Sequence, residues 1–457
     1  MSLAIIILAA GKGTRMKSAK PKVMHTLAGK PMLQHVIDTA KQLSPSQLAV
    51  VSGNGADEVV PFLQNQQIDV VMQHEQKGTG HAVEQAKASF VNSEQVLVLY
   101  GDVPLITADT LQDLIESGDN NSLKVLTAIL EDPTGYGRIV RDYDDNMLCI
   151  TEEKDADEET KLINEINTGI MCIPAKWLTE ALSQLDNNNT QGEYYLTDLI
   201  AKAVNQGIEI NSVTCEDEME VAGINNRVQL AEVESYYQQL KATELMMSGV
   251  TFRDPARVDI RGDIKAGQDI TIDINVIFEG NNTIADNVSI GANCILINST
   301  IHEGAEILPN SIIENAEVGT NCSVGPFARL RPGTKLAAKA KVGNFVEVKN
   351  ANIGLGSKIN HLSYIGDTDM GADVNIGAGT ITCNYDGANK HRTVIGDRVF
   401  VGSDTQLVAP VTVEDGATIG AGSTIRKTAP ADSLTLTKSE QKTVKGWQRP
   451  IKKKNTG

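Results

Sequence analysis

The second half of the chain repeats an aliphatic residue every sixth position, and this spacing constrains the fold more than any other feature. A six-residue period is typical of a parallel β-helix, in which each repeat supplies one short strand and one turn. A sandwich of alternating strands would show a period of two instead. The repeated residues are Ile264, Ile270 and Val276; Ile295, Ile301 and Ile307; Ile312, Val318, Val324, Leu330, Leu336, Val342 and Val348; Ile353, Ile359 and Ile365; and Ile395, Val401, Leu407, Val413, Ile419 and Ile425.

Three sides per coil use about 18 residues, so Val258 to Arg426 predicts roughly nine coils about 4.8 Å apart. Glycine directly follows many of the aliphatic residues, as in Val342-Gly343 and Ile376-Gly377. We expect these glycines to let the chain turn its corners. The spacing breaks once, between Ile376 and Ile395, where the extra residues lie in 382–390. Insertions in solenoids form loops on one face, often the binding face.

The first half has a different pattern. Apolar runs such as Ala4–Leu8 and Val96–Tyr100 alternate with helix-like stretches such as Met32–Gln42, which indicates a covered, largely parallel sheet. Apolar residues at helical spacing from Val228 to Met247 predict a connecting helix. We therefore expect an α/β domain over residues 1–227, a linker helix over 228–250 and a β-helix domain over 251–457.

Charge and cysteine content limit the possible partners. The formal charge of −17 disfavours nucleic acid or an anionic membrane as the main partner, because either needs a broad basic face. Six cysteines occur without CxxC pairs, which favours reduced thiols and a cytoplasmic location. The basic run Lys452–Lys454 is most simply a solvated charge run.

A glycine-rich turn follows the first predicted strand, from Leu8 to Met16, with Pro21-Lys22 after it. Small residues let backbone N–H groups approach phosphate oxygens, so we expect Leu8, Ala9 and Gly11 to contact substrate. Arg15 and Lys22 add positive charge for a triphosphate. The alternative is a plain strand-to-helix turn, since the turn has neither the GxGxxG nor the GxxxxGK[ST] spacing.

A second feature supports a nucleotide site. The strand Val96–Tyr100 ends in Gly101-Asp102, at the edge of a parallel sheet where such folds bind ligands. Magnesium takes oxygen ligands and shares phosphate oxygens with the protein, which suits Asp102. The alternative role for Asp102 is that of a turn or cap residue.

The β-helix half carries its own candidate residues. Arg331, Lys349 and Lys390 are suited to hold a sugar phosphate by charge-assisted hydrogen bonds. His361 neighbours none of the inward aliphatic residues, which predicts that it projects outward. Histidine is often structural, but an amine attacking a thioester needs a base, and imidazole has a reference pKa of about 6.5.

Residues Leu8 to Lys22 resemble the LxxGxGTRMxxxxPK signature of sugar-1-phosphate nucleotidyltransferases. From end to end, the chain is similar to the bacterial bifunctional N-acetylglucosamine-1-phosphate uridylyltransferases/glucosamine-1-phosphate acetyltransferases. The resemblance implies a Rossmann-like nucleotidyltransferase followed by a left-handed parallel β-helix. It also implies UDP-N-acetylglucosamine synthesis for peptidoglycan and lipopolysaccharide precursors, from glucosamine-1-phosphate, acetyl-CoA, UTP and Mg²⁺, in a homotrimer.

The resemblance also assigns residues in the first half. Uracil recognition falls to Gln73, Gly78 and Thr79, and sugar binding to Gly137, Glu152 and Asn167. Tyr100 and Gly101 belong to the substrate site, and Asp102 with Asn225 binds Mg²⁺.

In the second half the resemblance makes His361 the general base, assisted by Glu347. It assigns Tyr364, Asn375 and Lys390 to the sugar, and acetyl-CoA contacts to Ala378, Asn384, Tyr385, Ser403 and Ala421. Lys438 stands where the family often has arginine and is expected to meet the CoA phosphates; lysine keeps the charge but loses the bidentate fork.

Two alternatives remain from the sequence. One is a structural or regulatory subunit with the same architecture, against which Arg15, Lys22, Asp102, Asn225 and His361 argue. The other is an ADP-glucose-type pyrophosphorylase, whose relatives have a shorter β-helix without the inserted loop.

Overall fold

The computed structural model describes residues 2–451, so the Lys452–Lys454 run lies outside the described residues. The chain divides into two compact units, one ending at Lys241 and the other beginning at Ala242. No helix within residues 2–451 combines the length and apolar character needed to cross a membrane.

The first unit is built on a nine-stranded sheet whose main order is β11-β7-β10-β6-β1-β4-β5. Its neighbouring strands are parallel except for β10, which runs antiparallel to β6 and β7, and β8 and β9, which form an antiparallel extension. The strands are β1 (Leu3–Ala9), β4 (Gln47–Ser52), β5 (Asp69–Met72), β6 (Gln95–Tyr100), β7 (Leu123–Ile129), β8 (Gly137–Arg141), β9 (Met147–Thr151), β10 (Glu165–Pro174) and β11 (Ile210–Cys215), with a small separate pair, β2 (Thr26–Leu27) and β3 (Lys30–Pro31).

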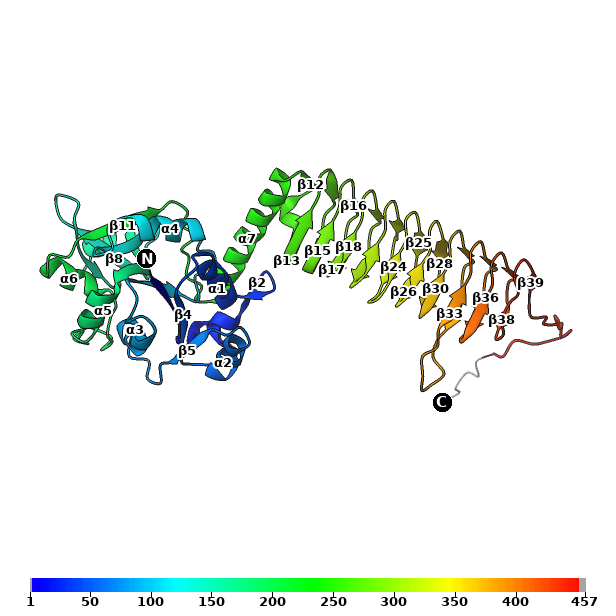
Figure 1. Cartoon of the computed structure of the whole chain (residues 1–457), viewed down its shortest axis with the longest axis horizontal. Coiled ribbons are helices and arrows are strands. Elements are labelled where there is room, and N and C mark those ends of the chain that lie inside the picture. The colour runs from blue at the N-terminus through cyan, green and yellow to red at the C-terminus, as the bar shows by residue number, and fades with distance from the viewer. Residues whose placement is uncertain (1, 452–457) are drawn as a thin grey trace. The chain divides into compact units, whose positions relative to one another are not determined.

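Helices cover both faces of this sheet (Figure 1), which is why its central strand is apolar at every position. On β1, Ile5 and Ile7 pack with α1, α2 and α4, whereas Ile6 and Leu8 pack with α3, α5 and α6. Successive strand residues point to opposite faces, so both sets are buried. The helices are α1 (Met32–Gln42), α2 (Ala56–Gln64), α3 (Thr79–Gln85), α4 (Ala108–Glu116), α5 (Ala175–Leu182), α6 (Asp198–Asn205) and α7 (Arg227–Met247). The predicted helix Met32–Gln42 is confirmed as α1.

The long helix α7 contributes to both units. In its first half, Val233 is buried with Met32, and Glu234 accepts a hydrogen bond from the backbone of Ala28 at 2.8 Å. In its second half, Ala242 belongs to the apolar core of the β-helix. The segment expected as a linker is therefore anchored at both ends.

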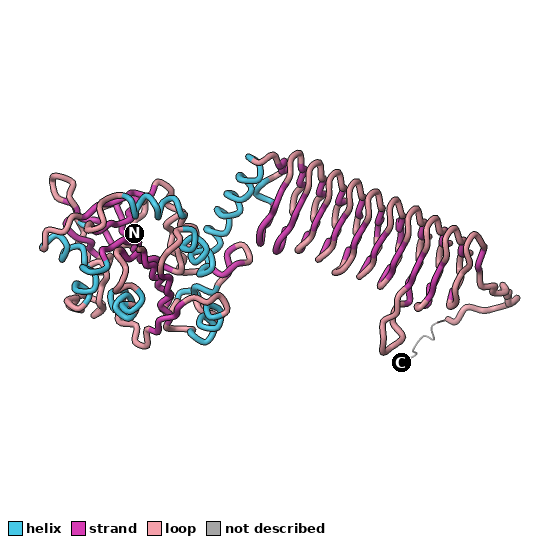
Figure 2. The backbone as a smooth tube through the Cα atoms, in the orientation of Figure 1, coloured by secondary structure: helices cyan, strands magenta, loops and turns pink. Residues whose placement is uncertain are grey.

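The second unit is a parallel β-helix with three faces (Figure 2). The first face is β12 (Val250–Phe252), β14 (Ile270–Ile272), β16 (Ser289–Ile290), β19 (Glu306–Ile307), β22 (Ser323–Val324), β25 (Lys341–Asn344), β28 (Lys358–His361), β31 (Asn375–Ile376), β34 (Phe400–Val401), β37 (Thr418–Ile419) and β39 (Leu434–Thr435). The second is β13 (Val258–Ala266), β15 (Val276–Ile284), β17 (Ile295–Ile297), β20 (Ile312–Glu314), β23 (Arg329–Leu330), β26 (Glu347–Lys349), β29 (Tyr364–Gly366), β32 (Ile381–Cys383), β35 (Gln406–Val408) and β38 (Thr424–Ile425). The third, beyond the long β13 and β15, is β18 (Thr300–Ile301), β21 (Glu317–Val318), β24 (Lys335–Leu336), β27 (Asn352–Ile353), β30 (Thr368–Met370), β33 (Thr393–Ile395) and β36 (Val411–Val413).

The aliphatic repeat fills the interior of this stack, except at three positions. Ile264 on β13 is only half-buried against the core. Ile295 and Ile312 are only half-buried, and the residues that follow them, Leu296 and Ile313, are fully buried instead. The next residues of the repeat are Ile301 and Val318, which lie five positions after Leu296 and Ile313 rather than six. The turns in between use one residue fewer, which moves the inward position by one. The stack also extends beyond the predicted range, from β12 to β39.

Most of the glycines after the aliphatic residues have a different purpose from the expected one, although Gly325, which follows Val324, does have a positive φ of 109°. Neither Gly343 nor Gly377 has a left-handed backbone, but a Cβ on Gly343 would lie 2.1 Å from the Asn360 carbonyl oxygen of the next coil. These glycines permit close stacking of coils. The corners are turned mainly by asparagine and aspartate in the left-handed region, such as Asn293 (φ 59°) and Asn310 (φ 61°), which tolerate it best among residues other than glycine.

Candidate functional sites

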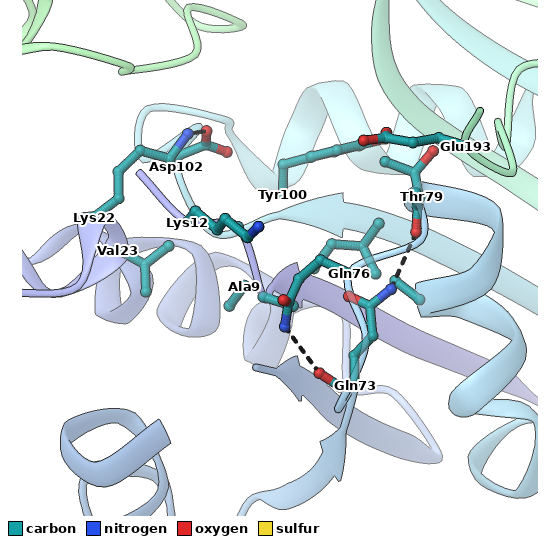
Figure 3. Close-up of a pocket in the computed structure, with 15 residues that line it drawn as sticks. Ala9, Lys12, Lys22, Val23, Gln73, Gln76, Thr79, Tyr100, Asp102 and Glu193 are labelled. Atoms are coloured by element: carbon teal, nitrogen blue, oxygen red, sulfur yellow. Dashed lines mark hydrogen bonds and ion pairs between the residues drawn. The ribbon is translucent and has the colours of Figure 1, made fainter. Parts of the chain in front are cut away.

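Loops at the carboxyl ends of β1, β5 and β6 line a half-open cavity of about 450 Å³ in the first unit (Figure 3). Nine of the predicted residues line it: Leu8, Ala9, Gly11, Lys22, Gln73, Gly78, Thr79, Tyr100 and Asp102. The parallel order of β1, β4, β5 and β6 brings these ends to one edge of the sheet, as ligand-binding α/β folds do.

Two cations and two oxygen ligands meet at one end of this cavity. Lys22 forms an ion pair with Asp102 and donates to the Asn225 side-chain oxygen at 3.0 Å. Arg15 donates to the same oxygen at 2.8 Å. A Cβ on Gly13 would lie 2.8 Å from the Lys22 Cβ, so this glycine of the turn lets Lys22 approach. The structure thus brings together four residues that the sequence analysis placed in one site.

The residues expected to hold the sugar form a second group. A Cβ on Gly137 would lie 3.5 Å from a Glu152 carboxylate oxygen, and Glu152 accepts a hydrogen bond from the Thr197 hydroxyl at 3.0 Å. Burial raises the pKa of Glu152. Burial also raises the pKa of Tyr100, and the nearby charge of Glu152 raises it further. Because Tyr100 lines the cavity, it connects the nucleotide cavity with the residues expected to hold the sugar. Asn167 is buried and accepts from the backbone N–H of Gly169 at 3.0 Å.

Three polar residues of the cavity wall were not predicted as site residues. Lys12 lies between two glycines of the turn, a position that could have identified it. Gln76, which donates to the Gln73 carbonyl at 3.1 Å, and Glu193 come from irregular loops. Nothing in their local sequence indicates that these loops return to the cavity.

On the β-helix, three cations gather on the second face and the inserted loop. Arg331 pairs with Glu347 at 2.7 Å. The neighbouring ammonium of Lys390 lowers the pKa of Lys349, and Arg331 contributes in the same direction. Crowded positive charge of this kind favours binding of an anion. The inserted loop contributes Lys390 from the end of a short bridge between Tyr385 and Lys390.

His361 is exposed at the end of β28, as predicted. Its Nδ1 lies 3.0 Å from the side-chain oxygen of Asn344 on the preceding coil. An amide oxygen accepts hydrogen bonds, so this arrangement suits the tautomer that has its proton on Nδ1 and a lone pair on Nε2. Within residues 2–451 no hydrogen bond joins Glu347 to His361, because the Glu347 carboxylate pairs with Arg331. Asn344 was not among the predicted site residues.

A column of small residues continues from His361 along the stack. The register Val342↔Ile359↔Ile376↔Val401↔Ile419 aligns the positions two residues further on: Asn344, His361, Ala378, Ser403 and Ala421. Thr437 donates to the Ser423 hydroxyl at 3.2 Å, which holds the exposed Lys438 close to the end of this column. Three of the predicted acetyl-CoA residues, Ala378, Ser403 and Ala421, therefore lie in line with the predicted base, whereas Asn384 and Tyr385 lie outside this column.

The remaining predicted residues surround this cluster. Tyr364 pairs in register with Glu347, and Asn375 lies on β31 of the first face. Asn384 is buried and donates to Asp367, whereas Tyr385 is exposed. Asp367 also accepts from Asn350, and these hydrogen bonds lower its pKa against the opposing effect of burial.

Known protein families match segments in both halves of the chain. Residues 5–193 match the MobA-like NTP transferase domain family, residues 260–358 the GMPPB C-terminal domain family and residues 392–427 the bacterial transferase hexapeptide family (six repeats). A solved structure described as a putative glucose-1-phosphate thymidylyltransferase from Bacillus anthracis in complex with a sucrose matches at 19% identity and a TM-score of 0.42, covering 51% of this chain and 95% of that chain. At that score the likeness adds nothing to the assignment.

The bifunctional protein GlmU of Marinobacter nauticus is 52% identical over 450 residues, covering 98% of this chain and 99% of that protein. Identity at this level over the full length of both chains extends to each of the two units. The protein therefore belongs to the family of bifunctional GlmU proteins.

Proposed function

We infer that the chain makes UDP-N-acetylglucosamine by two reactions. The β-helix unit transfers an acetyl group from acetyl-CoA to glucosamine-1-phosphate, and the α/β unit joins the product to UTP with release of pyrophosphate. The observation that carries this inference is the end-to-end match to a bifunctional GlmU protein. The nucleotide-sized cavity and the row of predicted residues around His361 support it.

The test is an assay of the purified protein with glucosamine-1-phosphate, acetyl-CoA, UTP and Mg²⁺. We expect both cosubstrates to be consumed and UDP-N-acetylglucosamine to form. Consumption of neither indicates a structural or regulatory subunit. Nucleotide transfer alone, with another sugar phosphate, indicates a pyrophosphorylase of the ADP-glucose type.

For uridylyl transfer, we propose that a phosphate oxygen of the sugar phosphate attacks the α-phosphorus of UTP in line and that pyrophosphate leaves. The protein then acts by positioning the reactants and neutralising their charge. Arg15 and Lys22 contact the triphosphate, while Glu152 and Asn167 orient the sugar. Lys22 must leave Asp102 to reach the phosphates, which the flexible lysine side chain permits.

We propose that Asp102 and Asn225 bind Mg²⁺. Oxygens of both side chains contact the single ammonium group of Lys22, so they converge on one cation, and carboxylate and amide oxygens suit magnesium. When bound, the ion neutralises charge on the phosphates. Calorimetric titration of Mg²⁺ into the wild-type protein and into Asp102→Asn, both without substrate, tests this assignment independently of turnover.

For acetyl transfer, we propose that the glucosamine nitrogen attacks the thioester carbonyl, forming the amide as CoA leaves as a thiolate that is then protonated. The free Nε2 of His361 takes the proton of the attacking amine. Asn344 holds the imidazole in the required tautomer. Arg331, Lys349 and Lys390 bind the sugar phosphate, and the column ending at Ala421 supports the extended CoA.

We propose that the acetyl-transfer site is completed in a homotrimer. One corner of the β-helix carries Phe327, Phe345 and Leu362 in the left-handed region, with exposed fractions of 50%, 56% and 64%. The two phenylalanine rings stack at 5.3 Å. Such a backbone costs roughly 1–2 kcal/mol per bulky residue, and an exposed apolar strip of this kind marks a protein contact.

This strip borders the proposed base directly, because Asn344 precedes Phe345 and His361 precedes Leu362. A neighbouring copy docked on the strip would cover His361 from the side. We further propose that the enzyme acts in the cytoplasm. All six cysteines are free thiols in the structure, which suits a reducing compartment.

A further inference from the structure

His81, on α3, contacts Gln73, which lines the nucleotide cavity, but His81 itself does not line that cavity. It lines a separate polar cavity of about 250 Å³, not the nucleotide cavity, so it does not touch substrate. Gln73 is 3% exposed and its side chain forms part of the wall seen in Figure 3. The Gln73 amide nitrogen lies 3.1 Å from the Gly78 carbonyl oxygen and 3.0 Å from Nδ1 of His81.

The Gly78 carbonyl fixes the direction of the first of these hydrogen bonds. A carbonyl oxygen only accepts, so the Gln73 amide must present its nitrogen there. Gly78 itself has φ 106°, and a Cβ on it would lie 2.5 Å from the Tyr194 carbonyl oxygen. Backbone hydrogen bonds from Tyr194 to Lys77 (2.8 Å) and from Gly80 to Tyr194 (2.9 Å) hold this turn in place.

The second hydrogen of the same amide then points at His81. Nδ1 of the imidazole must accept it, which places the ring proton on Nε2. The amide nitrogen of Gln85 lies 3.3 Å from Nε2, and a half-turn of this exposed amide brings its oxygen to the Nε2 proton. His81 also packs beside the Tyr194 ring, with centroids 6.5 Å apart, so the imidazole has a defined position.

We propose that His81 is a positioning residue that fixes the Gln73 amide with its oxygen toward the cavity and thereby sets base selectivity. Both hydrogens of the amide nitrogen are used, which leaves the oxygen as an acceptor for the base. A pyrimidine that carries a hydrogen on ring atom N3, such as uracil, donates to this oxygen. Cytosine presents an acceptor at that nitrogen and is repelled. This inference rests on the proposed uridylyl transfer.

The test compares UTP and CTP as substrates for wild-type protein, His81→Asn and His81→Gln, with N-acetylglucosamine-1-phosphate and Mg²⁺. The asparagine oxygen can take the place of Nδ1, whereas the glutamine amide reaches the place of Nε2. We expect His81→Asn to keep the wild-type ratio of kcat/KM for UTP over CTP. We expect His81→Gln to lower it about five- to tenfold, the range of one neutral hydrogen bond, chiefly through KM for UTP.

His74→Gln is the matched control, because His74 is exposed next to Gln73 in the sequence. It should leave both nucleotides unaffected. Equal ratios for His81→Asn and His81→Gln would overturn the positioning role while leaving uridylyl transfer intact. A wild-type protein that does not use UTP would instead overturn the proposed function itself.

Discussion

The proposed nucleotide site is a cavity lined by loops, whereas the proposed acetyl-transfer residues lie on the outside of a regular stack. Irregular loops after β1, β5 and β6 can fold over a ligand, so Lys22, Asp102 and Asn225 meet although 80 and 203 residues separate Lys22 from the other two. A three-faced coil has only convex outer surfaces, and His361 stands exposed on one of them. We propose that the first kind of site is complete in one chain, whereas the second is completed by another copy.

Removing the arginine of the glycine-rich turn is expected to have the largest effect and to separate the two regions. Arg15→Ala should lower uridylyl transfer roughly a thousandfold, because one preorganised charged donor to the transition state is lost. Acetyl transfer should persist. Separate assays with UTP and with acetyl-CoA measure this, with Lys41→Ala on α1 as the control for lost surface charge. Equal loss of both activities would contradict separate sites.

The corresponding change in the β-helix is His361→Ala. Loss of a general base is expected to lower acetyl transfer about a hundredfold or more, with uridylyl transfer retained. His302→Ala provides a control, since His302 is a β-helix histidine that pairs with Glu317 at 3.0 Å. A full acetyl-transfer rate for His361→Ala at every pH would refute the assignment of the base.

The close stacking of coils predicts an effect on stability in the second unit alone. Gly343→Ala places a Cβ 2.1 Å from the Asn360 carbonyl oxygen, and the overpacking should destabilise the β-helix by about 1–3 kcal/mol. Thermal unfolding followed with both activities should show acetyl transfer lost at a lower temperature and uridylyl transfer unchanged. The exposed Ser289→Ala is the control. An unchanged unfolding temperature would mean that the glycine is not needed for coil contact.

The smallest expected effect concerns Glu152 in the first unit. Burial raises its pKa above the ordinary value of 4.5, so the folded state binds more protons than the unfolded state as pH rises through this range, and stability falls. Glu152→Gln removes this penalty. The variant should melt about 1–3 °C higher than wild type at neutral pH, with no difference below the ordinary pKa. A difference independent of pH would point to packing instead.

Much of the β-helix could be predicted because each repeat contacts only its neighbours, so a local period defines the interior. The errors at Ile295 and Ile312 arise where two adjacent residues are aliphatic and a five-residue corner follows at Asn298 or Asn315. Spacing alone does not distinguish a five-residue corner from a six-residue one. Which of two adjacent aliphatic residues points inward is therefore decided by how each coil stacks on its neighbours.

Less of the nucleotide site could be predicted from the local sequence. The turn at Gly11–Met16 and the strand ending at Asp102 have local signatures, so Arg15, Lys22 and Asp102 could be proposed. Gln76 and Glu193 reach the cavity only through tertiary folding of irregular loops. The role inferred for His81 depends on the direction of two hydrogen bonds, which no sequence pattern shows.

The most direct test of the contrast between a self-contained site and a shared one is the double variant Phe327→Asp/Phe345→Asp. Aspartate tolerates the left-handed backbone of this corner better than phenylalanine, so each chain should still fold. Analytical ultracentrifugation combined with both assays is expected to show single chains with uridylyl transfer intact and acetyl transfer lost. Single chains that keep the full acetyl-transfer rate, or an unchanged trimer, would contradict the account.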